Sequence, residues 1–117
     1  MDIISKQKLH QLSQYTADFI KSKTGKGPRD IKSHFFDNKI FIEMYKLLTP
    51  IELEIASTLD GITNVKLARE RFYEKYAQNY HGIASQIMGC QIIYGCTLWD
   101  IINDEAYIIL TINPTEL

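Results

Sequence analysis

The chain has 117 residues, of which 45% are apolar and 23% charged, and its net charge is −1. This length suits one domain, residues 1–117, with a core that needs neither metal nor disulfide support. The average composition excludes a disordered or fibrous protein, and the apolar runs are far shorter than the ~18 residues that a membrane-spanning helix needs. Because the N-terminus lacks a signal-like pattern, we expect a cytoplasmic protein.

Charge is unevenly distributed along the chain. Residues 1–39 carry eight Lys or Arg and four Asp, whereas residues 40–117 carry five Lys or Arg and ten Asp or Glu. Five cations cluster around one turn: Lys21, Lys23, Lys26, Arg29 and Lys32. They are explained either as a solvated helix end or as a docking patch for an anion, an acidic partner or an anionic lipid surface. We expect no nucleic-acid partner, because the cluster lacks interleaved aromatic residues.

The first predicted element is a helix over about residues 5–24. Its apolar stripe consists of Leu9, Leu12, Thr16, Phe19 and Ile20. These residues recur at helical spacing, which is typical of a surface helix with one buried face. Gly25 is placed to end this helix in the left-handed conformation, and Pro28 prevents the helix from resuming.

Residues 30–37 and 39–46 predict a β-hairpin. Both segments alternate between apolar and polar residues, and Asp37-Asn38-Lys39 between them has the composition of a turn. On the first strand, one face carries Ile31, Ser33 and Phe35 and the other carries Lys32, His34 and Phe36.

Thr49-Pro50-Ile51-Glu52 predicts the start of a second helix, because Thr49 can cap it, Pro50 suits its first position and Glu52 completes a capping box. We expect this helix to run to about residue 59 and to end at Gly61. The expected inward residues are Leu53, Ala56 and Leu59.

A long third helix is predicted from Thr63 or Asn64 to the stop at Gly89. Its stripe consists of Val65, Ala68, Phe72, Tyr76, Ile83 and Ile87. At ~1.5 Å per residue this helix spans close to 40 Å, longer than a core of this size needs. The surplus stripe, with the nearby Tyr73 and Tyr80, predicts a homodimer through residues 64–88.

Two strands complete the chain, over residues 91–102 and 106–112. On the first we expect Ile92, Tyr94, Cys96 and Leu98 to share a face, and Gly95 to mark a bulge or a close backbone approach. The element order, helix, two strands, two helices, two strands, predicts an α+β fold. In this fold two β-hairpins form a four-stranded antiparallel sheet with the helices on one face.

No catalytic, cofactor-binding or metal-binding residue is predicted, so we do not expect an enzyme. Gly25-Lys26-Gly27-Pro28 follows a helix rather than a strand, unlike a phosphate-binding loop. His10, His34 and His81 lack a second ligand at metal spacing. Cys90 and Cys96 would lie about 20 Å apart on an extended strand, too far for a disulfide.

Arg71 and Asp100 have two interpretations. They could form a partly buried ion pair or a binding group at the end of a strand. Alternatively, Arg71 lies on the surface and Asp100 caps a turn.

Several of these residues lie in an order and spacing that is typical of one family. They are Gly25, Gly27 and Pro28, then Asp37, then Leu48, Thr49, Pro50 and Glu52, then Arg71, and finally Asp100 after Leu98 and Trp99. Over about residues 4–112 the chain thereby resembles the small bacterial and archaeal MpsC-like proteins, first described as a domain of unknown function. The family commonly has Arg where this chain has Lys26, and the resemblance transfers no catalytic residue.

The resemblance implies a function at a membrane. MpsC is named as a component of a Na⁺-translocating, membrane-potential-generating system. It implies a non-catalytic accessory or regulatory protein for membrane cation or bicarbonate transport, located in the cytoplasm or peripherally at the inner face of the membrane, with an integral membrane transporter subunit as partner. The alternative is a cytosolic small-molecule-sensing or signalling module, with a pocket lined by Tyr94 and Trp99 between the sheet and the long helix.

Overall fold

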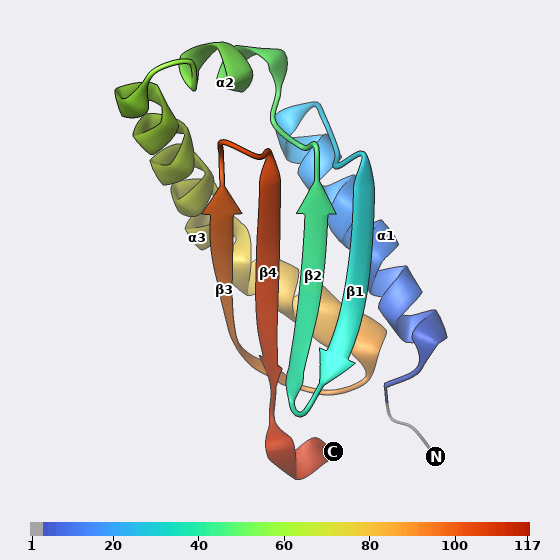
Figure 1. Ribbon diagram of the computed structural model, residues 1–117. Coiled ribbons are helices and arrows are strands. Elements are labelled where there is room, and N and C mark those ends of the chain that lie inside the picture. The colour runs from blue at the N-terminus through green and yellow to red at the C-terminus, as the bar shows by residue number, and fades with distance from the viewer. Residues whose placement is uncertain (1–3) are drawn as a thin grey trace.

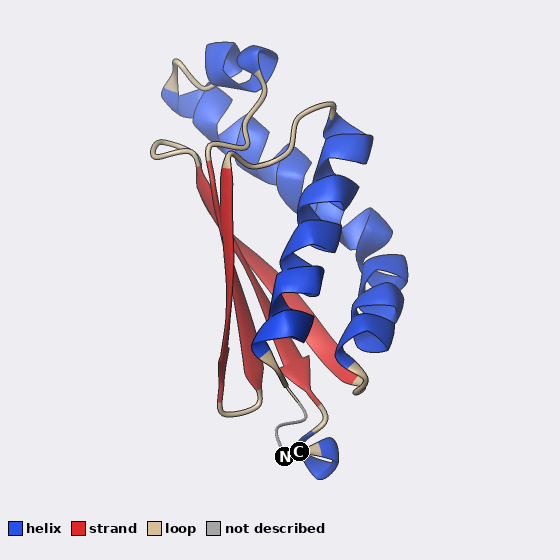
Figure 2. Ribbon diagram, turned by 90° about the vertical axis from the view of Figure 1, so that its right-hand side faces the viewer, coloured by secondary structure: helices blue, strands red, loops and turns tan. Residues whose placement is uncertain are grey.

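The computed structural model describes residues 4–117, which form a sheet covered on one face by helices (Figures 1 and 2). The elements in chain order are α1 (Lys6–Thr24), β1 (Asp30–Phe36), β2 (Lys39–Tyr45), α2 (Pro50–Ile55), α3 (Leu59–Met88), β3 (Ile92–Asp100), β4 (Glu105–Ile112) and a 3₁₀ turn η1 (Pro114–Glu116). Among these residues, no helix is both long enough and apolar enough to cross a membrane.

The sheet has the strand order β1-β2-β4-β3, and each neighbouring pair is antiparallel. The two hairpins therefore lie side by side, with β2 and β4 at the centre. Both central strands alternate between buried and half-buried residues, as expected when helices cover only one face. The predicted α+β class, the element order and the two-hairpin sheet are confirmed.

The helix ends follow the predicted capping chemistry. Gly25 is left-handed, with φ of 86°, and its amide donates to the carbonyl of Lys21. Thr49 and Glu52 form the capping box of α2, and Gly89 ends α3 with φ of 70°. These ends depend on hydrogen bonds between residues a few positions apart, which is why the sequence reveals them.

The boundary between α2 and α3 differs from the prediction. Helix α3 begins at Leu59 rather than at residue 63 or 64, and Thr58 caps it by accepting a hydrogen bond from the amide of Gly61. Gly61 therefore lies inside α3, where its missing side chain lets the backbone of Ile55 approach closely. Leu53 and Leu59, predicted to face inward, are exposed.

The buried face of α3 also differs from the predicted stripe. The buried residues are Gly61, Val65, Arg69, Tyr80, Ala84 and Met88, whereas Ala68 is exposed. Phe72 and Tyr76 of the predicted stripe contact Phe19 of α1, with ring centroids 6.0 Å and 5.9 Å apart. The aromatic part of this stripe is thus covered by α1 within one chain, so it is not surplus.

A bulge near the start of β3 separates Ile92 from the other residues of its predicted face. The register shifts between Ile92 and Tyr94, so Ile92 is buried in the core while Tyr94, Cys96 and Leu98 lie on the uncovered face. Tyr94, Cys96 and Leu98 therefore share a face as predicted, whereas the prediction is wrong for Ile92. Gly95 does mark a close approach, because a side chain there would overlap Tyr73 and His81. Cys90 and Cys96 are both free thiols.

Candidate functional site

An ion pair between the half-buried Glu52 of α2 and the buried Arg69 of α3 is the main polar feature of the interior. The Arg69 side chain is 3% exposed, and its guanidinium holds both carboxylate oxygens of Glu52. Nε donates to Oε2 at 2.7 Å and Nη2 donates to Oε1 at 2.6 Å. Nη2 also donates to the carbonyl of Leu47 at 3.2 Å. This forked geometry is the strongest form of a charge-assisted hydrogen bond.

Glu52 also completes the cap of α2. Its Oε1 accepts from the amide and the hydroxyl of Thr49, at 2.9 Å and 3.0 Å, and its own amide donates to the Thr49 hydroxyl. Burial acts to raise the pKa of Glu52, but the hydrogen bonds from Arg69 and Thr49 outweigh burial and hold this pKa below its usual value. Glu52 is therefore a carboxylate that both starts α2 and fastens it to α3.

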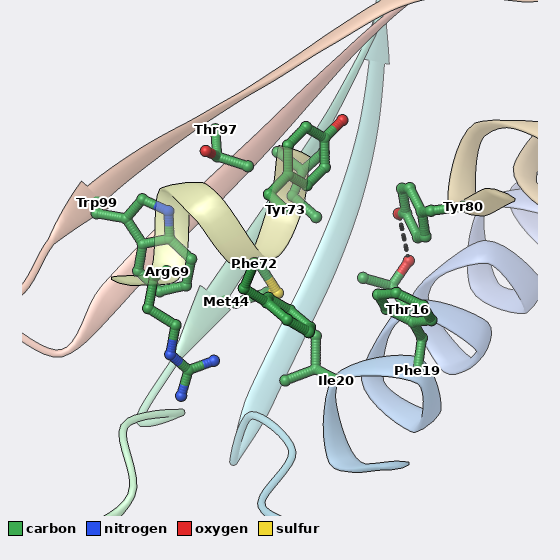
Figure 3. Close-up of a pocket in the computed structure, with 11 residues that line it drawn as sticks. Thr16, Phe19, Ile20, Met44, Arg69, Phe72, Tyr73, Tyr80, Thr97 and Trp99 are labelled. Atoms are coloured by element: carbon green, nitrogen blue, oxygen red, sulfur yellow. Dashed lines mark hydrogen bonds between the residues drawn. The ribbon is translucent and has the colours of Figure 1, made fainter. Parts of the chain in front are cut away.

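Trp99 of β3 covers the Arg69 side chain from the sheet side. The guanidinium carbon lies 5.4 Å from the centre of the indole ring, a distance typical of a cation–π contact. Figure 3 shows the Arg69 and Trp99 side chains beside each other. Within the described residues, Arg69 Nη1 and Trp99 Nε1 are buried without a hydrogen-bond acceptor.

Two turns meet at the segment that leads into α2. Lys26, from the Gly-Lys-Gly-Pro turn, donates through Nζ to the carbonyl of Leu48 at 2.8 Å. Asp104, from the turn between β3 and β4, accepts at Oδ1 from the amides of Leu47 and Leu48, each at 2.9 Å. Hydrogen bonds thus join the motif residues around Leu48 to the turn after α1 and to the turn between β3 and β4.

The cavity between the sheet and the helices is small. It has a volume of about 20 Å³ and is lined by aromatic and aliphatic side chains, with Arg69 and Trp99 at one end (Figure 3). A space of ~10–15 Å³ holds one water molecule, so this cavity is too small for a metabolite. Tyr94 lies on the opposite face of the sheet and does not line it, contrary to the predicted pocket.

Arg71 and Asp100 do not come together as a site. Arg71 is exposed on α3, and Asp100 accepts hydrogen bonds from the amide and the side chain of Asn103, as a turn cap does. The buried arginine is Arg69, which was not among the predicted site residues. Its position four residues after the buried Val65 is the signal that could have identified it.

The structure places the five predicted patch cations in several different surroundings. Lys26 and Arg29 lie in a groove together with Lys46, whereas Lys32 lies in another groove between α1 and β1. Lys23 is placed over the Tyr76 ring, 4.7 Å from its centre. Lys21 is exposed on the last turn of α1.

Tyr73 and His81 form a second polar contact, where α3 crosses Gly95. Their Oη and Nε2 atoms are 2.5 Å apart. Burial lowers the pKa of His81 and raises that of Tyr73, so both groups are neutral near pH 7. Among residues 4–117, no three His, Cys, Asp or Glu side chains lie close enough to hold a metal ion.

These features describe a small two-layer α+β protein in which a partly buried ion pair between Glu52 and Arg69 joins the start of α2 to the long helix α3. Residues 5–113 match the profile of the family described as "Na+-translocating membrane potential-generating system (MpsC)", so the chain belongs to the MpsC family. No curated protein and no solved structure matches the chain.

Proposed function

We propose that the protein is a non-catalytic accessory or regulatory subunit of a membrane cation or bicarbonate transport system that supports the membrane potential. It acts from the cytoplasmic side, and an integral membrane partner carries the ions. The family match over residues 5–113 carries this proposal. The motif residues Thr49 and Glu52 use their polar atoms in the cap of α2 and in the ion pair with Arg69. This structural use of the motif is in keeping with a binding role rather than a catalytic one.

The alternative, a small-molecule sensor, has less support. A sensor needs a pocket of about 300 Å³ or more to enclose a metabolite. The interior cavity here has about 20 Å³ and a nearly continuous apolar lining. We therefore place the function on the surface of the molecule rather than in its interior.

The accessory role is tested in cells that lack the protein. If it supports the transport system, the membrane potential measured with a potential-sensitive dye should fall when Na⁺ is limiting, and re-expression of the wild-type chain should restore it. In parallel, tagged protein should recover an integral membrane transport subunit from gently solubilised membranes. An excess of untagged protein should abolish this recovery. An unchanged potential together with no recovered membrane subunit would contradict the proposal.

A further inference from the structure

One end of the molecule exposes an unusual number of large aliphatic side chains. Helix α2, the start of α3 and the turn between β3 and β4 meet there (Figure 1). Ile51, Leu59 and Ile102 are 73%, 83% and 76% exposed, and Leu53 is 48% exposed. None of the residues of α2 is buried. Exposed aliphatic groups gathered at one site are typical of an interaction surface.

A basic groove lies at the same end. Lys26, Arg29 and Lys46 line it together with Leu53 and Ile102, around a volume of about 510 Å³. The acidic residue in its wall, Asp104, already uses Oδ1 to accept two backbone hydrogen bonds. Lys26 donates to the Leu48 carbonyl, whereas Arg29 and Lys46 are exposed and available to an anion.

The chemistry of this end suits a lipid surface better than a protein. Protein interfaces favour aromatic residues, Met and Arg and contain few Lys. Elements that bind membranes combine Lys or Arg with Leu, Phe or Trp side chains that enter the boundary between headgroups and acyl chains, and this end has two Lys, one Arg and several aliphatic groups. The exposed aromatic residues of the sheet lie on other parts of the molecule: Phe35 and Phe36 in β1 and Tyr94 near the start of β3.

We infer that this end docks on an anionic phospholipid bilayer. Lipid phosphates occupy the groove beside Arg29 and Lys46, while Leu53 and Ile102 at its rim, with Ile51, enter the acyl boundary. Asp30 and Glu54 are also exposed nearby, so charge alone does not hold the protein and the aliphatic side chains are needed. The inference deepens the proposed function and rests on it for the presence of the protein at a membrane.

The test is flotation of the full chain with protein-free vesicles. Vesicles of phosphatidylcholine containing about 30% phosphatidylglycerol should carry the protein, vesicles of phosphatidylcholine alone should not, and high salt should weaken the binding. The Arg29→Gln/Lys46→Gln variant should bind roughly fivefold more weakly for each cation removed. The Leu53→Ser/Ile102→Ser variant should lose most of its binding even at low salt.

Matched control variants come from other parts of the chain. Lys32→Gln removes a cation from a different groove, and Ile93→Ser removes a half-exposed aliphatic group near the start of β3. Both should float like the wild type, and circular dichroism should show that every variant is folded. Equal binding to neutral vesicles, equal losses in the controls, or binding only to free inorganic phosphate would overturn the inference.

The two proposals fail in different ways. If the protein recovers a transport subunit from solubilised membranes but does not float with vesicles, the lipid inference is wrong and the accessory role stands. If it floats as expected but recovers no subunit and leaves the membrane potential unchanged, lipid docking stands and the accessory role is wrong.

Discussion

Arg69 is the residue on which the interior depends most. A buried guanidinium is tolerated only when its charge is paired and its donors are used. Glu52 supplies the opposite charge and accepts two hydrogen bonds, and the Leu47 carbonyl accepts a third, so that only Nη1 is left without an acceptor among the described residues. Because the same carboxylate caps α2, loss of either charge disturbs both the helix start and the contact between α2 and α3.

Arg69→Met should therefore destabilise the protein much more than Arg71→Met. The first substitution leaves the partly buried Glu52 carboxylate without its partner, which should lower the free energy of unfolding by about 3 kcal/mol. This value lies toward the low end of the usual range because 20% of the Glu52 side chain is exposed. Arg71 is exposed, so its substitution should change the free energy of unfolding by less than about 0.5 kcal/mol. Urea denaturation followed by circular dichroism measures both, and equal effects would contradict the assignment.

The same ion pair should make stability depend on pH in the acid range. Because the pKa of Glu52 is lowered in the folded protein, the unfolded chain binds its proton more readily, so stability is lost as the pH falls below about 4.5 and through the folded pKa. Glu52→Gln should be less stable near pH 7 and should lose less stability between about pH 5 and pH 3. The pKa of His81 is also lowered, so some stability is lost as the pH falls below about 6.5. This loss is the same in the wild type and in Glu52→Gln, so it cancels when the two proteins are compared. Parallel curves for the two proteins would contradict this prediction.

Among the elements, α2 is held by its connections rather than by burial. It has six residues, none of them buried, and an isolated helix of this length is not stable in water. Its capping box, the Arg69 pair and the close passage of Ile55 over Gly61 hold it in place. The short turn into α3 therefore tolerates no added side chain at Gly61.

Gly61→Ala and Gly82→Ala should have opposite effects although both glycines lie in α3. A methyl group at Gly61 would overlap the backbone of Ile55, which would have to move. This overlap should lower the free energy of unfolding by about 3 kcal/mol. Gly82 is exposed with no atom near its added methyl group, so alanine there should stabilise the helix by about 1 kcal/mol. Thermal unfolding distinguishes the two, and a stabilising Gly61→Ala would show that the turn has room for a methyl group.

At the scale of the whole molecule, the two layers leave clearly different surfaces. Both long helices cover one face of the sheet, while the other face has no helix over it (Figure 2). The molecule is elongated, with extents of 49 × 22 × 22 Å, and the aliphatic and basic end occupies one tip. The end that we infer to bind lipid is therefore at a tip of the molecule rather than on a broad face of the sheet.

The homodimer through residues 64–88 stays a prediction. Phe72 and Tyr76 are engaged with Phe19 of α1, so the contact would involve the outward part of α3, where Leu67 is half exposed. Light scattering at micromolar concentration should give twice the 13.6 kDa mass of one chain, and Leu67→Glu should reduce that mass. A monomer mass for the wild type would rule out this dimer.

The sequence by itself determined the type and order of the elements and most of their ends. The alternation in β1 and β2, the capping box of Thr49 and Glu52 and the left-handed Gly25 all depend on residues within a few positions of one another. Such local interactions leave a readable pattern, and they also predicted the two-hairpin sheet.

Only the tertiary structure decided which faces those elements bury and which distant residues meet. Arg69 faces inward because Glu52 of α2 pairs with its charge and Trp99 of β3 packs against its guanidinium. The bulge after Ile92 places Tyr94 on the uncovered face of the sheet. Lys46 and Ile102 join Arg29 in one groove although they are far apart in the chain. These outcomes depend on contacts between segments tens of residues apart, and local periodicity carries no information about such contacts.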